Sequence, residues 1–234
     1  MNTITENHIY GRNAVAEAIK ANRNIDFISV STRSGSMHKI IELAKENNII
    51  IKTTTDEKLT KMCETTAHQG VVASVAAFEY AEFESFFDKQ NLVILDGLQD
   101  PQNFGAIIRS AEVFGFDGII IPKRGSVSLN STVFKTSAGA AGIVPVAKVS
   151  NLVWAITELK KHNFWIYGAD MTGDNLRNTE FSGKVVLVIG AEGFGLSRLV
   201  KENCDCLISV PMFGQINSLN ASVAAGVCMY EIRR

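Results

Sequence analysis

The sequence lacks the features that would assign it to several common classes of protein. No apolar run approaches the ~20 residues that a membrane-spanning helix needs, so we expect no membrane partner. Residues 1–13 lack a basic start followed by an apolar segment, which argues against a signal peptide and favours a cytoplasmic protein. Neither a G-x-S-x-G elbow nor an H-E-x-x-H motif is present, so the sequence does not predict a serine hydrolase or a zinc peptidase.

Cysteine is scarce, and its spacing does not indicate a metal site. The four cysteines are Cys63, Cys204, Cys206 and Cys228, and no two of them form a C-x-x-C pair. His68 follows Cys63 by five residues, but the sequence offers no second half-site. We therefore expect no metal ion, and reduced thiols that are mostly buried.

Positive charge is not in excess either. The chain has 23 Lys and Arg against 24 Asp and Glu, a formal net charge of -1. The basic and acidic residues are also nearly balanced within residues 1–80 and within residues 81–234. The basic balance of many nucleic-acid-binding proteins is therefore missing, and any site for a polyanion must be a local patch.

The sequence does contain two successive α/β patterns, which predict two domains. Residues 1–76 alternate short helical and strand patterns, such as "GRNAVAEAIKA" followed by "DFISVS". Residues 91–234 contain nearly continuous apolar strands, such as "KVVLVIG", separated by helical patterns. Such strands are typical of a parallel sheet with helices on both faces.

Residues 77–90, between these patterns, are rich in Phe and in acidic residues. We interpret them as a linker whose aromatic side chains pack on one or both domains. A base-stacking role is the alternative, which the surrounding acids disfavour because they would repel phosphates.

Three segments that follow predicted strands carry unusual polar residues. In the first, a strand ends at Asp96, a turn follows, and Asn103 can cap the next helix. Arg109 interrupts the apolar face of that helix, so it needs a partner or must extend to solvent. Because ligands collect at the carboxyl ends of parallel strands, these residues are candidates for a site. The alternative is a capping residue and a surface arginine.

The second segment, "GAEGFGLS", places Glu192 among Gly190, Gly193 and Gly195. The glycine order differs from the G-x-G-x-x-G of dinucleotide-binding proteins, and a glutamate would be badly placed beside a pyrophosphate. The loop therefore favours a neutral or cationic ligand over an oxidoreductase cofactor, unless it is only a turn that needs glycine. The third segment, "GQINSLNASVAAG", supplies Ser218 and Asn220 at the start of the last predicted helix. All four histidines lie outside these segments, so the candidates for general acid–base catalysis are Glu192, Arg109 and the substrate itself.

The segments "NFGAIIRSAEVFG", "VIGAEGFGLS" and "VPMFGQINSLNASVAAG" resemble the three motifs of the SpoU/TrmH RNA 2′-O-ribose methyltransferases of the SPOUT superfamily. The early "IYGRNAVAEAI" and "HQGVVA" resemble the RlmB-like branch, whose members methylate a guanosine ribose in 23S ribosomal RNA. The resemblance implies a SPOUT domain with a deep trefoil knot at 91–234 and an L30e/L7Ae-like RNA-binding domain at 1–76. It also implies S-adenosylmethionine as methyl donor, and a homodimer with sites near its interface.

Our hypothesis for the mechanism gives roles to individual residues. Arg109 would contact the target phosphate and hydroxyl, held by Asn103 and Ser218. Glu192 would fix Arg109 or a neighbouring donor, and Asn220 would order the loop that shapes the donor pocket. The positions that match the family's active site are Asn103, Arg109, Glu192, Ser218 and Asn220. The positions expected to contact the methyl donor are Gly190, Gly193, Val210, Met212 and Leu219.

The RNA itself would be held by a few basic residues, which could equally be ordinary solvated charge. The candidates are Arg12, Arg23, Arg33, Lys123 and Arg124. Two alternative functions stay open: a tRNA 2′-O-ribose methyltransferase, and a non-catalytic RNA-binding protein with an inactive knot domain.

Overall fold

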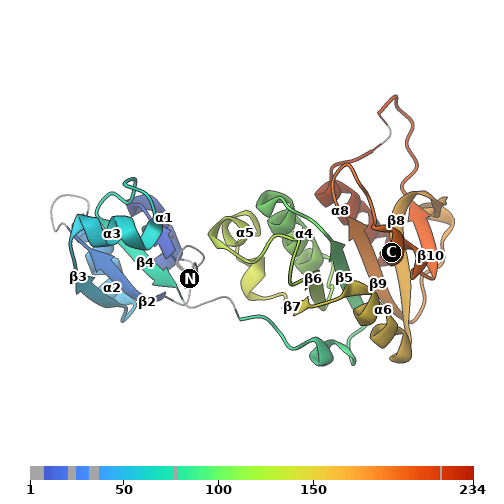
Figure 1. Ribbon diagram of the computed structural model, residues 1–234, viewed down its shortest axis with the longest axis horizontal. Helices are drawn as coiled ribbons and strands as arrows, with labels where there is room; N and C mark the ends of the chain where they lie inside the picture. The colour runs from blue at the N-terminus through green and yellow to red at the C-terminus, as the bar shows by residue number, and fades with distance from the viewer. Residues whose placement is uncertain (1–7, 21–24, 32–36, 76–78, 217) are drawn as a thin grey trace. The chain divides into compact units, whose positions relative to one another are not determined.

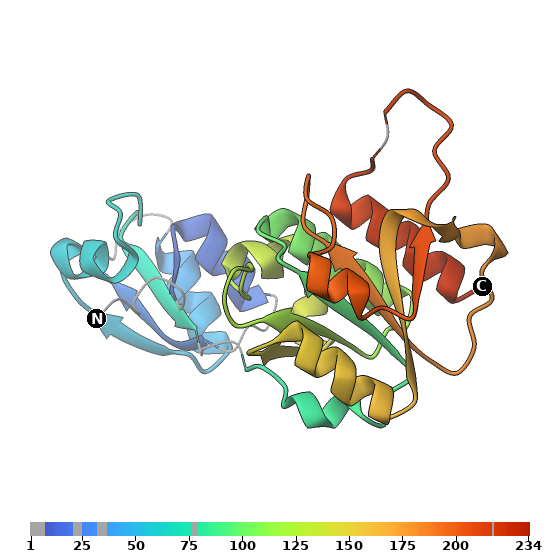
Figure 2. The same cartoon turned by 45° about the vertical axis from the view of Figure 1, so that its right-hand side comes forward.

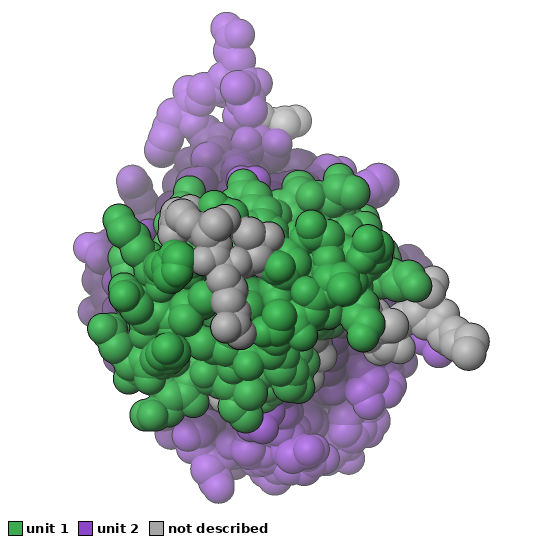
Figure 3. Space-filling view, turned by 90° about the vertical axis from the view of Figure 1, so that its left-hand side faces the viewer, with its two compact units in different colours: residues 1–78 green, residues 79–234 purple. Residues whose placement is uncertain are grey.

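The structure is a computed structural model that describes residues 8–20, 25–31, 37–75, 79–216 and 218–234 (Figure 1). The chain divides into two compact units, Met1–Phe78 and Glu79–Arg234, which are coloured separately in Figure 3. Each unit has a hydrophobic core of its own.

The described residues of the first unit form a four-stranded mixed sheet. In sheet order the strands are β1 (His8–Tyr10), β4 (Val71–Val75), β2 (Ile25–Val30) and β3 (Ile50–Thr53). Only the β2–β3 pair is parallel. The helices are α1 (Arg12–Lys20), α2 (Met37–Glu46) and α3 (Asp56–Cys63). Apolar residues of α1 and α2, such as Val15 and Ile40, are buried against the sheet.

The second unit contains the parallel sheet that the apolar strands predict. In sheet order the strands are β10 (Cys206–Ser209), β8 (Phe164–Asn175), β9 (Lys184–Gly190), β5 (Asn91–Asp96), β6 (Gly118–Pro122) and β7 (Val146–Val149). Every neighbouring pair of strands is parallel. The carboxyl ends of the strands therefore meet at one edge of the sheet.

Helices cover both faces of this sheet (Figures 1 and 2). They are α4 (Pro101–Val113), α5 (Ser131–Thr136), α6 (Leu152–Lys161), α7 (Arg198–Glu202) and α8 (Ala221–Ile232). Shorter 3₁₀ turns are η1 (Phe83–Phe86), η2 (Ala140–Gly142) and η3 (Leu176–Asn178). Leu92 and Ile94 of β5 pack against the side chains of η1, α6 and α7. Alternate residues of the strand face the other way, towards the layer in which α4 packs on α5 and α8.

The aromatic segment between the two sequence patterns packs on the second unit. Phe83 and Phe86 are buried in its core, and Ala81 pairs with Ala147 of β7. The packing interpretation is confirmed for these two rings. Residues 79–90 of the predicted linker lie within the second unit.

A side chain caps the start of α3 and of α4. Thr55 caps α3, because its hydroxyl accepts a hydrogen bond from the Lys58 backbone N–H at 3.4 Å. The prediction that Asn103 caps α4 is wrong. Asp100 is the cap, with Oδ1 accepting from Gln102 N at 3.0 Å, and Pro101 occupies the first helical position. Among the described residues, none of the helices has both the length and the apolar character to cross a bilayer.

Candidate functional site

Three polar side chains from distant parts of the sequence form one cluster at the carboxyl edge of the sheet. Asn103 lies in the first turns of α4, Glu192 in the loop after β9, and Asn220 at the start of α8. The Asn103 amide donates a hydrogen bond from Nδ2 to Glu192 Oε1. Asn220 Nδ2 donates to the same carboxylate oxygen and to Asn103 Oδ1, each at 3.0 Å. We call Asn103, Glu192 and Asn220 the polar cluster.

The backbone of α8 fixes the orientation of the Asn220 amide. Asn220 is the N-cap, and its Oδ1 accepts from the backbone N–H groups of Ser222 and Val223 at 3.0 and 3.3 Å. The Ser222 hydroxyl adds a third hydrogen bond to this oxygen at 2.6 Å. Because Oδ1 is used by these donors, the NH₂ group must face Glu192 and Asn103. The first turn of α8 thus positions the polar cluster.

The glycines of the loop after β9 allow it to fold back tightly. Ala191 and Gly195 exchange backbone hydrogen bonds of 2.9 and 3.0 Å. A Cβ atom on Gly190 would lie 2.1 Å from the carbonyl carbon of Gly195, so only glycine fits there. Gly193 and Gly195 have positive φ and open space around their Cα atoms. The turn projects Glu192 towards Asn103 while leaving the loop's outer side accessible.

Asp96 anchors the end of the same loop. Its Oδ2 accepts a hydrogen bond from the backbone N–H of Ser197 at 2.6 Å. The loop after β9 is therefore tied to the end of β5 at Asp96 and to α4 and α8 through Glu192. Both attachments lie where β5 and β9 end side by side, since Asp96 pairs with Gly190.

The structure does not bring Arg109 to the polar cluster. Arg109 follows Asn103 by six residues on α4, which separates them by about 9 Å along the helix axis and places them on different sides. Its side chain is exposed, and in the described part of the chain it has no hydrogen bond or ion pair. Ser218 is also exposed, and no bond joins it to the cluster in that part of the chain. The expectation that Asn103 and Ser218 hold Arg109 is therefore not realised within one chain.

The residues expected to contact the methyl donor lie along the loop after β9 and along the irregular segment between β10 and α8. Gly190 and Val210 are half-buried, while Gly193 is exposed. Met212 and Leu219 are 40% and 39% exposed. Neither of the two cavities described below is lined by these five residues.

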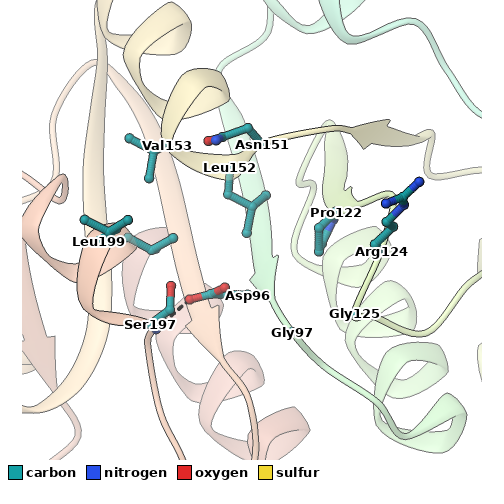
Figure 4. Close-up of a pocket in the computed structure, with 11 residues that line it drawn as sticks. Asp96, Gly97, Pro122, Arg124, Gly125, Asn151, Leu152, Val153, Ser197 and Leu199 are labelled. Carbon is teal, nitrogen blue, oxygen red and sulfur yellow. Dashed lines mark hydrogen bonds between the residues drawn. The ribbon is translucent and has the colours of Figure 1, made fainter.

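Those cavities follow the carboxyl edge of the sheet near α6. The first has a volume of about 280 Å³, and Asp96, Arg124, Asn151 and Ser197 are among its lining residues (Figure 4). The second, of about 390 Å³, is lined by residues of η1, β7 and α6. The two cavities share Asn151, which caps α6 by accepting from Trp154 N at 3.0 Å.

The basic residues expected to contact RNA have different surroundings. Arg12 donates from Nε to the Gln69 carbonyl at 3.1 Å, so its guanidinium supports the turn before β4. Lys123 and Arg124 are exposed directly after β6. Arg23 and Arg33 lie outside the described residues.

The thiols have environments that suit structural roles. All four cysteines are free. Burial raises the pKa of the Cys228 thiol to about 12. Burial is also the main cause that raises the pKa of Cys204 to about 12, while Lys160 opposes it. Both thiols therefore stay protonated at neutral pH and are poor nucleophiles.

Comparison with known families agrees with this architecture. Residues 90–230 match the SpoU rRNA Methylase family. The chain belongs to this family. Residues 8–81 match a second family, described as RNA 2'-O ribose methyltransferase substrate binding. As a member of the SpoU family, the chain is an RNA methyltransferase.

Relatives and solved structures cover nearly the whole chain. A TrmH family tRNA/rRNA methyltransferase of Staphylococcus haemolyticus is 46% identical, over 97% of this chain and 94% of the relative. An AdoMet-bound rRNA methyltransferase from Sinorhizobium meliloti has the same fold at 20% identity, with a TM-score of 0.72 over 97% of this chain and 87% of that one. The SpoU methyltransferase AviRb from Streptomyces viridochromogenes, in complex with AdoMet, matches at 22% identity and a TM-score of 0.71, over 97% and 89%.

Two features of this site are not among those that the sequence predicts. Ser222 contributes a hydroxyl to the Asn220 cap, and its place two residues after an Asn that begins a helix is the signal that could have indicated it. The second cavity was missed because η1 and β7, which line it, lie more than 50 residues apart in the sequence. The pairing of these segments is a tertiary property.

Proposed function

We propose that this SpoU family member transfers a methyl group from S-adenosylmethionine to a ribose 2′-hydroxyl, and that its target is a guanosine in 23S ribosomal RNA. The observation that carries the proposal is the polar cluster, which joins all three sequence motifs at the edge where parallel sheets bind ligands. The match of residues 8–81 to a substrate-binding family supports a large RNA substrate. Such an RNA places the reaction in the cytoplasm.

The residues present fit the proposed donor. When bound, S-adenosylmethionine supplies an electrophilic methyl group on a cationic sulfonium. The loop after β9 offers the Glu192 carboxylate and glycines with open space around Gly193 and Gly195, which allow close approach of a ligand. Met212 and Leu219 offer apolar contacts from the following segment. The proposed donor-contacting set is Gly190, Gly193, Val210, Met212 and Leu219.

The chain's own residues must orient and activate the ribose. A 2′-hydroxyl is a weak nucleophile, so it has to be held in line and partly deprotonated. Arg109 would favour the alkoxide by its charge and would bind the adjacent phosphate, but a guanidinium is not a base. The polar cluster would hold the loops rigid, and Ser218 would contact the substrate.

Arg109 lies away from the polar cluster of its own chain, which favours a dimer in which each chain supplies Arg109 to the site of the other. Val113 lies one helical turn after Arg109 and is 65% exposed. It continues into the exposed apolar face of α8, formed by Val223, Val227 and Tyr230, and the ring of Tyr230 contacts Phe114. Such a face is typical of an interface. We propose that in such a dimer Arg109 acts at the polar cluster of the partner. We include in this proposal the knotted path for α8 that the resemblance to the SPOUT superfamily implies.

Mapping of ribose methylation by mass spectrometry tests the proposal. RNA from cells with and without this protein is compared, and we expect one guanosine of 23S ribosomal RNA to lose its 2′-O-methyl group. A change confined to transfer RNA would move the substrate to that class, which the name of the Staphylococcus haemolyticus relative allows. Unchanged methylation in both RNA classes would contradict the proposed activity.

A further inference from the structure

The second cavity combines an exposed tryptophan with basic and acidic side chains. It lies at the carboxyl end of β7, between η1 and the first turn of α6, and its volume is about 390 Å³. That volume is within the range of small-ligand sites. Five of its lining residues carry the argument below: Glu82, Glu84, Lys123, Lys148 and Trp154. We call this set the Trp154 groove.

Trp154 is held from one side and open on the other. Its backbone is fixed by the Asn151 cap, and its ring lies 5.2 Å from the ring of Phe83 at an interplanar angle of 47°. Phe83 is buried, whereas Trp154 is 48% exposed. A ring supported in this way loses little freedom when a second ring stacks on it. Stacking of a nucleobase on an aromatic side chain is a main source of affinity for single-stranded RNA.

The polar groups around the ring match the remaining parts of a nucleotide. Lys123 is exposed, and its side chain has no hydrogen bond or ion pair in the described residues, so its ammonium group is available for a phosphate. Lys148 is held in place by a hydrogen bond of 2.8 Å to Ser128 Oγ and lies over the ring of Tyr80. Glu82 and Glu84 would repel a phosphate but accept hydrogen bonds from a base amino group.

The groove leads towards the polar cluster along the sheet edge. It shares Asn151 with the first cavity, which extends to Asp96 and Gly97 at the end of β5. A Cβ placed on Gly97 would lie 3.8 Å from the Cβ of Ala191, the residue that precedes Glu192. The groove, the first cavity and the loop that carries Glu192 therefore follow one another along the carboxyl ends of the strands.

We propose that the Trp154 groove binds one unpaired nucleotide of the RNA substrate, outside the target nucleotide. Its base stacks on Trp154, an amino group of the base donates to Glu82 or Glu84, and its phosphate contacts Lys123. The identity of the strand as substrate rests on the proposed function, whereas nucleotide binding in the groove does not.

Tryptophan fluorescence tests the stacking directly, because the chain has only two tryptophans. Trp165 is 52% exposed and is the second residue of β8, near the amino end of that strand, whereas the groove lies at the carboxyl end of β7. Trp165 is therefore the internal control. The W165F variant retains Trp154, and the W154F variant retains Trp165. Each is titrated with a single-stranded RNA oligonucleotide while anisotropy of the labelled RNA reports binding. We expect saturable quenching in W165F and unchanged emission in W154F. Saturated binding with unchanged Trp154 emission overturns the proposal.

Affinity measurements with matched variants give the size of the effect. W154L should weaken RNA binding about 5- to 150-fold, the range for one stacked base, while W165L stays close to the wild type and W154F restores most of the affinity. K123Q should lower the slope of log affinity against log salt by about one, whereas K89Q, at an exposed lysine outside the groove, should not. If circular dichroism shows that W154L and W165L are both folded and the two variants bind RNA with equal affinity, the proposal that the Trp154 groove binds RNA is wrong.

Two further readouts separate this inference from the proposed function. If the groove is right, W154L raises KM for RNA while donor affinity, measured by calorimetry, is unchanged. If wild-type chain transfers methyl groups and W154L does so with unaltered KM, the groove fails and the proposed function survives. If wild-type chain binds RNA through Trp154 but transfers nothing, the proposed function fails alone. Binding of free guanosine monophosphate at the same affinity as RNA would overturn an RNA-strand site.

Discussion

Replacing Asn220 by aspartate separates the two roles of this side chain. In the wild type, Oδ1 caps α8 by accepting from Ser222 and Val223, and Nδ2 donates to Glu192 Oε1 at 3.0 Å. Aspartate keeps an oxygen for the cap, because Asp and Asn are comparable caps. It also replaces the donor by a second carboxylate oxygen that faces Glu192. The variant therefore tests the polar cluster while leaving the start of α8 intact.

The expected loss follows from the distance and the exposure. Two unit charges about 3 Å apart repel by ~1.4 kcal/mol in water and by ~5.5 kcal/mol at an effective dielectric constant of 20. Glu192 and Asn220 are both exposed, so we expect a loss near the lower figure, ~1–2 kcal/mol. Salt should reduce this loss because it screens exposed charges.

Urea unfolding of the full chain, followed by tryptophan fluorescence, measures this loss in the second unit, which contains both tryptophans. The matched control is N220S, which keeps a capping oxygen and adds no charge. We expect N220D to be less stable than N220S at pH 7 and low salt, and the difference to shrink in 1 M salt. The donor affinity of N220D should fall too, since its loop is displaced. Equal stability of the two variants at low salt would refute the geometry of the polar cluster.

The remaining predictions concern other parts of the second unit. R109A should lower single-turnover methyl transfer more than ~100-fold with donor binding nearly unchanged, and a near-normal rate would remove Arg109 from the mechanism. Mixing R109A with E192A should restore part of the activity if Arg109 serves the partner's site, whereas no recovery would contradict that arrangement. G190A should abolish donor binding in calorimetry, because its Cβ would lie 2.1 Å from backbone, and wild-type affinity would contradict this close approach. V227E should shift the sedimentation coefficient to that of a monomer, and an unchanged dimer would exclude the α8 face as the interface. Cys228, whose pKa is raised to about 12 by burial, should contribute stability that is lost as pH rises above the ordinary thiol value of ~8.5 towards 12, and C228A should flatten that decline in urea unfolding.

The sequence pattern predicts the second sheet well because its strands are apolar on both faces. The structure gives the strand Lys184–Gly190 the same first and last residues as the predicted strand "KVVLVIG". The three-residue strand β1 was missed because it is too short to show a period. The cap of α4 was misplaced because Asp100 and Asn103 are both good caps, and Pro101 at the first helical position decides between them.

The candidate site was predictable as a set of segments but not as a set of contacts. Strand ends and glycine spacing indicated Glu192 and Asn220, and topology then brought them to Asn103. Arg109 faces away from this cluster because six residues along an α-helix bring a side chain to a different side of the helix. This orientation follows from the sequence once residues 103–109 are assigned to one helix. The Trp154 groove could not be predicted, because it forms only when η1 packs beside β7.

The most direct test of the proposed activity is transfer of radiolabelled methyl groups from S-adenosylmethionine to 23S ribosomal RNA, followed by alkaline hydrolysis. A 2′-O-methyl group blocks hydrolysis of the adjacent phosphodiester, so its label survives in alkali-resistant dinucleotides. The proposal predicts label in dinucleotides that begin with guanosine, and none with the E192A variant. Label recovered in mononucleotides would show methylation of a base, and that result would contradict the assignment of the ribose hydroxyl as the target.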